Sequence, residues 1–180
     1  MKRRTLVTFL LALSATSALA NPPIGEKPAT VTIGGDDGGR IDGQSWSSDM
    51  IKGKAFAFFY VDPDAKDVNL EMEKALKTEA FPRDRYGSIA VINMDATWLP
   101  NAAIASSLKS KQEEFPEVTY VKDLKKVLVK QWQMKDDDYA VLVFAPDGKV
   151  VFSRNGQLGK TDIAEMIAAI KQNMPPATAP

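Results

Sequence analysis

The 180-residue chain contains neither cysteine nor histidine. Without a thiol, disulfide exchange, thiolate-dependent peroxide reduction and thiolate metal sites are excluded. Without an imidazole, a Ser-His-Asp relay is excluded, and the side chain whose ordinary pKa lies nearest neutrality is missing. An enzyme built from this sequence would have to use carboxylates, lysine, serine, threonine or tyrosine. We therefore exclude thiol-disulfide oxidoreductase and peroxidase activity.

The amino terminus has the composition of an export leader. Basic residues at positions 2–4 precede an apolar stretch over positions 6–13, and small residues end in Ala18-Leu19-Ala20. These are the three parts of a secretory signal peptide. The apolar stretch is too short to remain as a membrane span. We predict that residues 1–20 are removed by cleavage after Ala20, and that the mature protein is periplasmic with no stable membrane anchor.

The charge of the chain argues against a nucleic-acid partner. The whole chain has 23 basic and 23 acidic residues. Without the leader and its three basic residues, 160 residues remain, with 20 basic and 23 acidic side chains and a net charge of −3. A slightly acidic chain without a basic block lacks the surface that binds phosphate backbones. Its length suits one compact domain.

Proline-rich segments flank this domain on both sides. Residues 21–28 carry three prolines and are predicted to form an extended, loosely held arm. A single domain is expected over residues 29–174. Residues 175–180 are again rich in proline and are expected to be a disordered tail.

The domain opens with a predicted β-hairpin. Residues 29–33 alternate like a half-buried strand, residues 34–39 supply turn formers, and residues 40–41 return as a second strand. The glycine-rich turn lacks the spacing of a phosphate-binding loop. We therefore assign it no ligand.

Two continuously apolar segments, 55–61 and 88–93, are predicted to be strands that are buried on both faces. The helix between them is predicted to begin with Asp67 as its N-cap and to end near Ala80. Its apolar face is formed by Val68, Met72 and Leu76. Such a strand–helix–strand unit is the core of an α/β domain.

The second half of the chain adds two helices, a hairpin and a final helix. The predicted elements are a helix at 102–114, a strand at 118–121, a helix at 124–132, paired strands at 139–144 and 150–153, and a helix from 161 or 162. A βαβ half followed by a ββα half resembles the thioredoxin fold. We predict an α/β, thioredoxin-like fold: a central mixed sheet with flanking helices and an N-terminal β-hairpin extension.

In the thioredoxin fold, the redox chemistry lies at the carboxyl end of the first central strand, where a C-x-x-C motif begins the next helix. The resemblance places Asp64 and Asp67 at the thiol positions. It places Tyr139 where that fold has a cis-proline. Both hallmarks are therefore replaced in this chain.

Several short motifs, taken in order, resemble the YtfJ family of exported bacterial proteins. They are Asn93-Met94-Asp95, Ser106-Ser107-Leu108 followed by Lys111, Trp132-Gln133-Met134, the segment from Ala140 to Val150, and Gly156-x-Leu158. The likeness covers about Lys54 to Asn173. It implies a thioredoxin-like fold without redox cysteines, and it implies no particular activity.

Three carboxylates follow the first buried strand. Asp62, Asp64 and Asp67 lie where open α/β sheets usually bind ligands. They could hold a hard cation such as calcium, or one of them could be an acid of raised pKa. Equally, they are suited to be an N-cap and two turn formers. The sequence leaves both interpretations open.

A second acidic segment, Asp136 to Asp138, precedes the hairpin strand. The repulsion between these carboxylates could be relieved by a cation, by a basic partner or by solvent. In the predicted fold this segment lies near the Asp62–Asp67 loop, so that the two form an acidic rim.

Aromatic residues are the third candidate. Trp98, Trp132 and Tyr139 would indicate protein recognition if they were exposed, and core packing if they were buried. The predicted binding surface is formed by Asp62, Asp64, Asp67, Asp138, Tyr139 and Trp132. No catalytic residue, cofactor or metal is assigned.

These observations support three hypotheses. The first is a non-redox periplasmic protein that binds an envelope protein or an extended peptide. The second is a carboxylate-based or metal-assisted enzyme that uses the Asp62–Asp67 loop. It requires two or more aspartates that converge on one pocket. The third is a structural envelope protein that makes its contacts through the arm.

Overall fold

The computed structural model describes residues 21–177. The predicted signal peptide and residues 178–180 of the predicted tail lie outside the described residues. Six strands form a mixed sheet in the order β2-β6-β5-β4-β7-β8. Their bounds are β2 Gly38–Arg40, β4 Ala55–Val61, β5 Tyr86–Asn93, β6 Val118–Asp123, β7 Tyr139–Phe144 and β8 Val150–Asn155.

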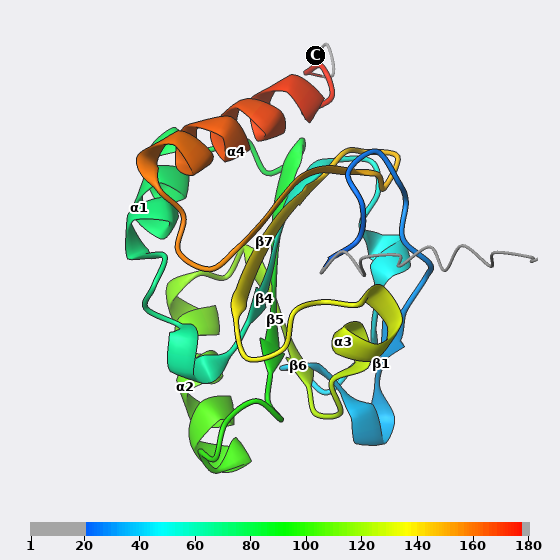
Figure 1. Ribbon diagram of the computed structural model, residues 1–180, viewed down its shortest axis with the longest axis vertical. Coiled ribbons are helices and arrows are strands. Elements are labelled where there is room, and N and C mark those ends of the chain that lie inside the picture. Colours follow the sequence, from blue (N-terminus) through cyan, green and yellow to red (C-terminus); the bar gives the residue numbers. More distant parts are fainter. Residues whose placement is uncertain (1–20, 178–180) are drawn as a thin grey trace, which may run out of the picture.

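Helices cover both faces of this sheet (Figure 1). Their bounds are α1 Leu70–Glu79, α2 Asn101–Glu114, α3 Val127–Trp132 and α4 Lys160–Asn173. Helices α1, α2 and α4 lie on one face, and α3 lies on the other. A small two-stranded sheet, β1 Thr32–Ile33 with β3 Trp46–Ser47, lies beside α3. The predicted α/β architecture, a mixed sheet flanked by helices, is confirmed.

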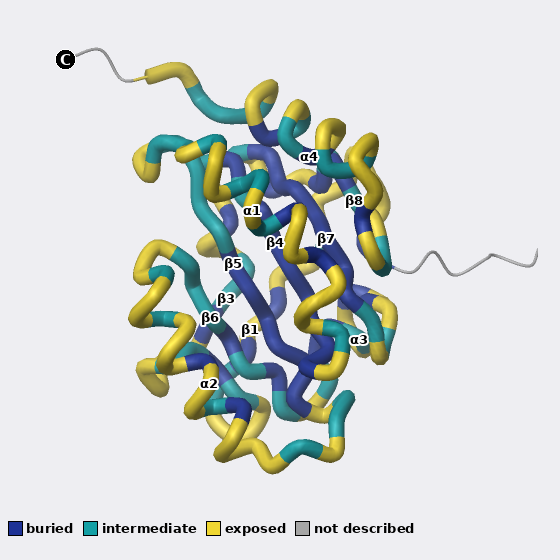
Figure 2. The backbone as a smooth tube through the Cα atoms, turned by 90° about the vertical axis from the view of Figure 1, so that its left-hand side faces the viewer, coloured by how far each residue is buried: buried dark blue, intermediate teal, exposed yellow. Residues whose placement is uncertain are grey.

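Strand β4 is at the centre because its sequence is apolar on both faces. It pairs in parallel with β5, where Phe58 faces Ile89, and antiparallel with β7, where Phe58 faces Leu142. Alternate side chains then enter two separate cores. The tube in Figure 2 shows these central strands as the most deeply buried part of the chain.

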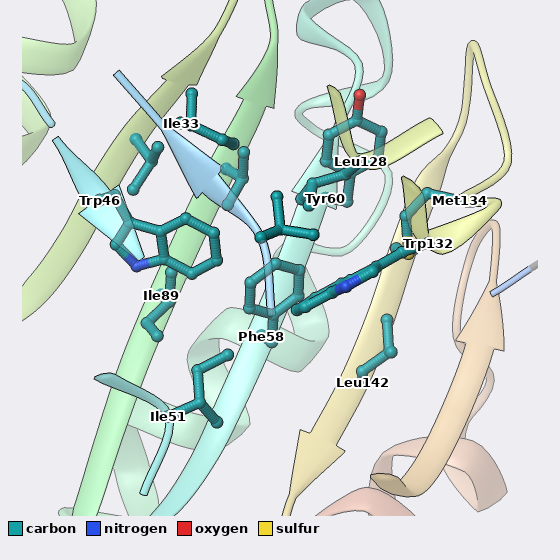
Figure 3. Close-up of a cluster of buried hydrophobic side chains, with 14 of the residues drawn as sticks. Ile33, Trp46, Ile51, Phe58, Tyr60, Ile89, Leu128, Trp132, Met134 and Leu142 are labelled. Atoms are coloured by element: carbon teal, nitrogen blue, oxygen red, sulfur yellow. The ribbon is translucent and has the colours of Figure 1, made fainter. Parts of the chain in front are cut away.

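The two cores differ in the elements that close them. On one face, Phe59 packs with Met72 of α1, Leu108 of α2 and Met166 of α4. The other face is closed by α3 and the small sheet and is rich in aromatic rings (Figure 3). There, the ring of Phe58 lies 5.6 Å from that of Trp132, 5.7 Å from Phe144 and 6.1 Å from Trp46.

The predicted hairpin between residues 29–33 and 40–41 is wrong. Strand β1 pairs with β3, and β2 instead joins the edge of the main sheet beside β6. A side chain at Gly38 would place its Cβ 1.9 Å from the carbonyl oxygen of Lys122. Gly38, at φ 123°, therefore permits a close approach of β6, and Gly39, at φ 127°, permits a close approach of the Gln44 carbonyl.

The amino-terminal arm is not loosely held, contrary to the sequence prediction. The N–H of Gly25 donates to the carbonyl of Val150 at 2.8 Å, and the N–H of Val150 donates to the carbonyl of Glu26 at 2.9 Å. Asn21 is buried. The arm thus satisfies part of the outer edge of β8, which would otherwise present unpaired backbone groups. This docking leaves less of the arm free for the contacts of the structural-protein hypothesis.

Helix α1 begins later than predicted, and Asp67 is not its N-cap. The chain after β4 first forms a 3-10 turn over Pro63–Ala65, and the residue that precedes α1 is Asn69. The buried Asn69 side chain accepts from the N–H of Leu158 at 2.8 Å and donates to the carbonyl of Gly156 at 3.0 Å. Val68 consequently lies outside the helix and is 38% exposed.

Within residues 21–177, no helix combines the length and apolar character that a membrane span requires.

Candidate functional site at the carboxyl edge of the sheet

Three loops meet at the edge where β4 and β5 end and β7 begins. We call residues 62–69, 94–100 and 133–138 together the carboxyl rim. The N–H of Asp62 donates to the carbonyl of Asp138 at 2.9 Å, so the two acidic segments are in direct contact. The Asp62–Asp67 loop and the segment Asp136 to Asp138 therefore lie side by side, as the predicted fold requires.

Asp62 is the buried carboxylate of the rim, with 7% of its surface exposed. Its Oδ1 accepts from the N–H of Asp64 at 2.8 Å and caps the 3-10 turn. Burial raises the pKa of the Asp62 carboxyl; the hydrogen bond from Asp64 opposes this rise, and the nearby carboxylates of Asp137 and Asp136 add to it. Asp62 thus has a structural role in the loop.

Asp64 and Asp67 point outward. Both are exposed, and Asp67 forms an ion pair with the neighbouring Lys66. An exposed pair of this kind contributes little to stability. Asp64 has no ion pair among residues 21–177. The two residues at the thiol positions of the fold are therefore solvent-facing carboxylates.

The repulsion in the run Asp136 to Asp138 is relieved by the protein's own lysines. Lys126 Nζ lies 2.7 Å from Asp136 Oδ2, and Lys135 Nζ lies 2.8 Å from Asp138 Oδ2. Burial opposes the ionisation of Asp136, but its hydrogen bonds from Lys126 and Asn93 outweigh that effect and hold its pKa below the usual value. Asp137 remains, with 67% of its side chain exposed and a longer contact of 3.9 Å to Lys126.

Lys126 connects the rim loops electrostatically. Its hydrogen bond to Asp136 raises its pKa against the opposing effect of burial, and the charges of Asp137 and Asp95 raise it further. Asp95 follows β5 and is exposed. The rim therefore has a net excess of carboxylates, although it includes two lysines, Lys66 and Lys135, and contacts a third, Lys126.

Beneath the rim lies a polar network that the sequence analysis missed. Asp123, fully buried at the end of β6, accepts from the N–H of Val127 at 2.8 Å and that of Leu128 at 3.0 Å. The Tyr60 hydroxyl donates to Asp123 at 3.2 Å. Burial and the charge of Asp123 raise the pKa of Tyr60, which keeps its proton. The carboxylate satisfies the first turn of α3 and holds this helix on the sheet.

A sequence signal for this network does exist. Asn93 and Asp123 each end an apolar strand at the same edge of the sheet, which is the usual position of polar site residues in open α/β sheets. Lys126, by contrast, gives no such signal, because its place beside Asp136 depends on the turn before α3.

Trp132 and Tyr139 do not belong to the binding surface, which corrects the sequence prediction. Trp132 is 4% exposed, packs on Phe58, and donates its indole N–H to the carbonyl of Ala29 at 2.7 Å. Tyr139 is 3% exposed and contacts Phe59 edge to face. Both are core residues. Trp98, in the loop after β5, is instead 86% exposed.

The described part of the chain offers no ligand cluster for the metal-assisted form of the enzyme hypothesis. No three histidine, cysteine, aspartate or glutamate residues in positions 21–177 are placed to hold one metal ion. A groove of about 360 Å³ is lined by Arg40, Gln112 and Tyr120 among others, and no rim aspartate faces it. The rim presents exposed carboxylates, and its loop after β5 carries one highly exposed tryptophan, Trp98.

Comparisons with known proteins identify the family of this chain. A family model described as "Bacterial protein of unknown function (YtfJ_HI0045)" matches residues 35–173. The chain belongs to the YtfJ family. Within this family, it is 25% identical to the uncharacterized protein YtfJ of Escherichia coli K12 over 158 residues, which cover 84% of this chain and 83% of that protein. It is 26% identical over 130 residues to an uncharacterized Haemophilus influenzae protein, with 71% of each chain covered.

The fold of this YtfJ-family chain is thioredoxin-like. It superposes on the exposed lipoprotein thioredoxin Etrx1 of Streptococcus pneumoniae with a TM-score of 0.56 at 15% identity. The superposition covers 78% of this chain and 98% of the pneumococcal chain. At this level of identity the likeness establishes the shared architecture alone, and the chain has no cysteine for that protein's chemistry.

The opposite pKa changes of Asp62 and Asp136 predict opposite effects of removing their charges. Asp62 binds its proton more tightly when folded, so it costs stability as the pH rises above about 4. Asp62→Asn keeps the Oδ1 acceptor and is expected to raise the free energy of unfolding at pH 7. The gain should vanish near pH 3, where the wild-type carboxyl is protonated.

Asp136→Asn is the matched control. The folded pKa of Asp136 is lowered, so its contribution is present above pH 4 and is lost as the pH falls through the folded pKa. Because the side chain is 36% exposed, the expected loss at pH 7 is only about 0.5 kcal/mol. Urea unfolding at pH 7 and pH 3 measures both effects, and equal signs for the two variants at pH 7 would contradict the assignment.

Proposed function

We propose that this protein is a non-redox, periplasmic binding module that recognises another envelope protein or an extended peptide through the carboxyl rim. The observation that carries the proposal is Trp98, which is 86% exposed in the loop after β5 that also contains Asp95. A tryptophan kept in water forgoes the free energy of its burial. Tryptophan is also the residue most enriched at the centres of protein interfaces.

The chemistry of the rim favours a partner with positive charge. Asp64 and Asp95 have no ion pair among the described residues, and Asp137 has only its longer contact to Lys126. A lysine or arginine of the partner could meet these carboxylates, and could also stack on the Trp98 indole. Two exposed apolar residues add to this surface: Val68, in the rim, is 38% exposed, and Leu70, just after it, is 55% exposed.

The scaffold supports this use of the rim. The loops that leave β4 and β5 start from a sheet whose central strands are buried on both faces, so a packed scaffold positions them at one edge. In the thioredoxin fold this edge already faces other polypeptide chains. Replacing its thiols with Asp64 and Asp67 removes the redox step and leaves a recognition surface.

The test is covalent capture in the envelope, followed by affinity measurement on the purified pair. Trp98→Ala is expected to weaken the captured complex at least tenfold, because an exposed aromatic anchor is lost. The double variant Asp64→Asn/Asp95→Asn should weaken it less and should flatten its salt dependence. Isothermal titration at two salt concentrations reports both changes.

Met50→Ala is the matched control, since Met50 is 45% exposed and lies in the 3-10 turn 48–50, outside the rim. It should leave the affinity unchanged. The proposal is wrong if the Met50 and Trp98 variants bind equally well, or if the captured set is the same for wild type and for both rim variants.

A further inference from the structure

The start of the predicted mature chain is anchored more tightly than the rest of the arm. Asn21 is 4% exposed, whereas Pro23 to Lys27 are exposed. Its Nδ2 donates to Ser153 Oγ at 3.1 Å and to Asn155 Oδ1 at 2.8 Å. Its backbone N–H donates to the carbonyl of Gln133 at 3.1 Å. One residue thus ties the arm to both β8 and the segment after α3.

The backbone conformation at position 21 suits asparagine, but one polar atom of its side chain is unpaired. Its φ of 82° is a conformation that asparagine adopts more readily than most residues. Its Oδ1 is buried and has no hydrogen-bond partner among residues 21–177. A buried acceptor without a donor is costly, and such a group in a native protein calls for a missing donor.

We propose that the missing donor is the α-amino group of Asn21 itself, released when the leader is cleaved. In that step water adds across the Ala20–Asn21 peptide bond, which leaves a carboxylate on Ala20 and an ammonium on Asn21. A peptide nitrogen offers one N–H, and the carbonyl of Gln133 takes it. An ammonium offers three, so the same nitrogen can also donate to its own Oδ1.

The new amino terminus is therefore a structural group of the mature fold. It fixes the first residue of the arm, and the Gly25–Val150 and Val150–Glu26 hydrogen bonds fix its middle. The carbonyl of Ala29, the residue that follows the arm, accepts from the Trp132 indole. Leader removal then secures the segment that covers the outer edge of β8, an edge open to pairing with another chain when the arm is detached.

The experiment compares three forms of the chain. One begins at Asn21, one has a Gly-Ser extension before Asn21, and one is the Asn21 form acetylated at its α-amino group. The backbone amides of Gly25 and Val150, which pair the arm with β8, report docking through hydrogen exchange. Both modified forms are expected to exchange at least tenfold faster at these amides than the Asn21 form.

Further variants separate the amine from the side chain. Asn21→Ala, made in the Asn21-start form, should also lose protection because it removes the contacts to Ser153 and Asn155. If Asn21→Ala loses protection but the extended and acetylated forms keep it within twofold, the side chain alone anchors the arm and the proposal is overturned. A mature chain isolated from the envelope that begins at another residue overturns it as well.

Discussion

Replacing Trp132 with alanine is expected to lower the free energy of unfolding by about 3–5 kcal/mol. The indole is 4% exposed and packs against Phe58 and Phe144 with ring centroids 5.6 and 5.9 Å away. Removing it leaves a cavity between α3 and the sheet, and it leaves the carbonyl of Ala29 without its donor. Urea unfolding followed by circular dichroism measures the loss.

The same substitution at Trp98 is the control for this prediction. Trp98 is 86% exposed, so Trp98→Ala should change the free energy of unfolding by less than about 0.5 kcal/mol. Trp132→Phe should fall between the two, because it keeps most of the packing but loses the hydrogen bond. Similar destabilisation by the two alanine variants would show that the assignment of one tryptophan to the core and the other to the surface is wrong.

Asp123→Ala is expected to destabilise the protein by about 3 kcal/mol, since it leaves several buried donors without an acceptor. Those donors are the Tyr60 hydroxyl and the N–H groups of Val127 and Leu128. The first turn of α3 would lose its cap, and the helix closes one of the two cores. Thermal and urea unfolding measure the change.

Tyr60→Phe separates the parts of this network. It removes one donor and leaves the contacts of Asp123 with α3 intact, so the expected loss is about 1 kcal/mol. Hydrogen exchange should show increased opening of α3 in Asp123→Ala and little change in Tyr60→Phe. If Tyr60→Phe were as damaging as Asp123→Ala, the cap on α3 would not be the main contribution of this carboxylate.

Two central strands, β4 and β7, could be predicted from the sequence residue by residue, and β5 begins at Tyr86, two residues before its predicted start. Strands β4 and β7 have the bounds expected from their apolar runs, 55–61 and 139–144. A strand covered on both faces must be apolar throughout, and that pattern needs no knowledge of its neighbours. The place of the acidic loops followed from the same argument, since a loop after β4 and a loop before its antiparallel partner β7 must meet at one edge.

The predictions of the N-terminal hairpin and of the N-cap of α1 were wrong because contacts between distant residues decide both, rather than the local sequence pattern. The glycines at 38–39 are suited to a turn, but they lie in a strand beside β6, which approaches Gly38 too closely for any side chain. Asp67 is a residue type that often serves as an N-cap, yet α1 begins at Leu70. The preceding residue, Asn69, is held by hydrogen bonds to Gly156 and Leu158. Neither contact has a signal in the surrounding residues.

By itself the sequence determined the absence of thiol chemistry, the α/β class, the order of the central strands along the chain and the edge at which charge collects. These follow from residue types and from apolar periodicity, which are local properties. The tertiary structure decided which tryptophan is core and which is surface, which lysine neutralises which aspartate, and where the arm docks. Each of these depends on contacts between residues that are distant in sequence. The free energy of such contacts arises only in the folded chain, so no single segment of the sequence reveals it.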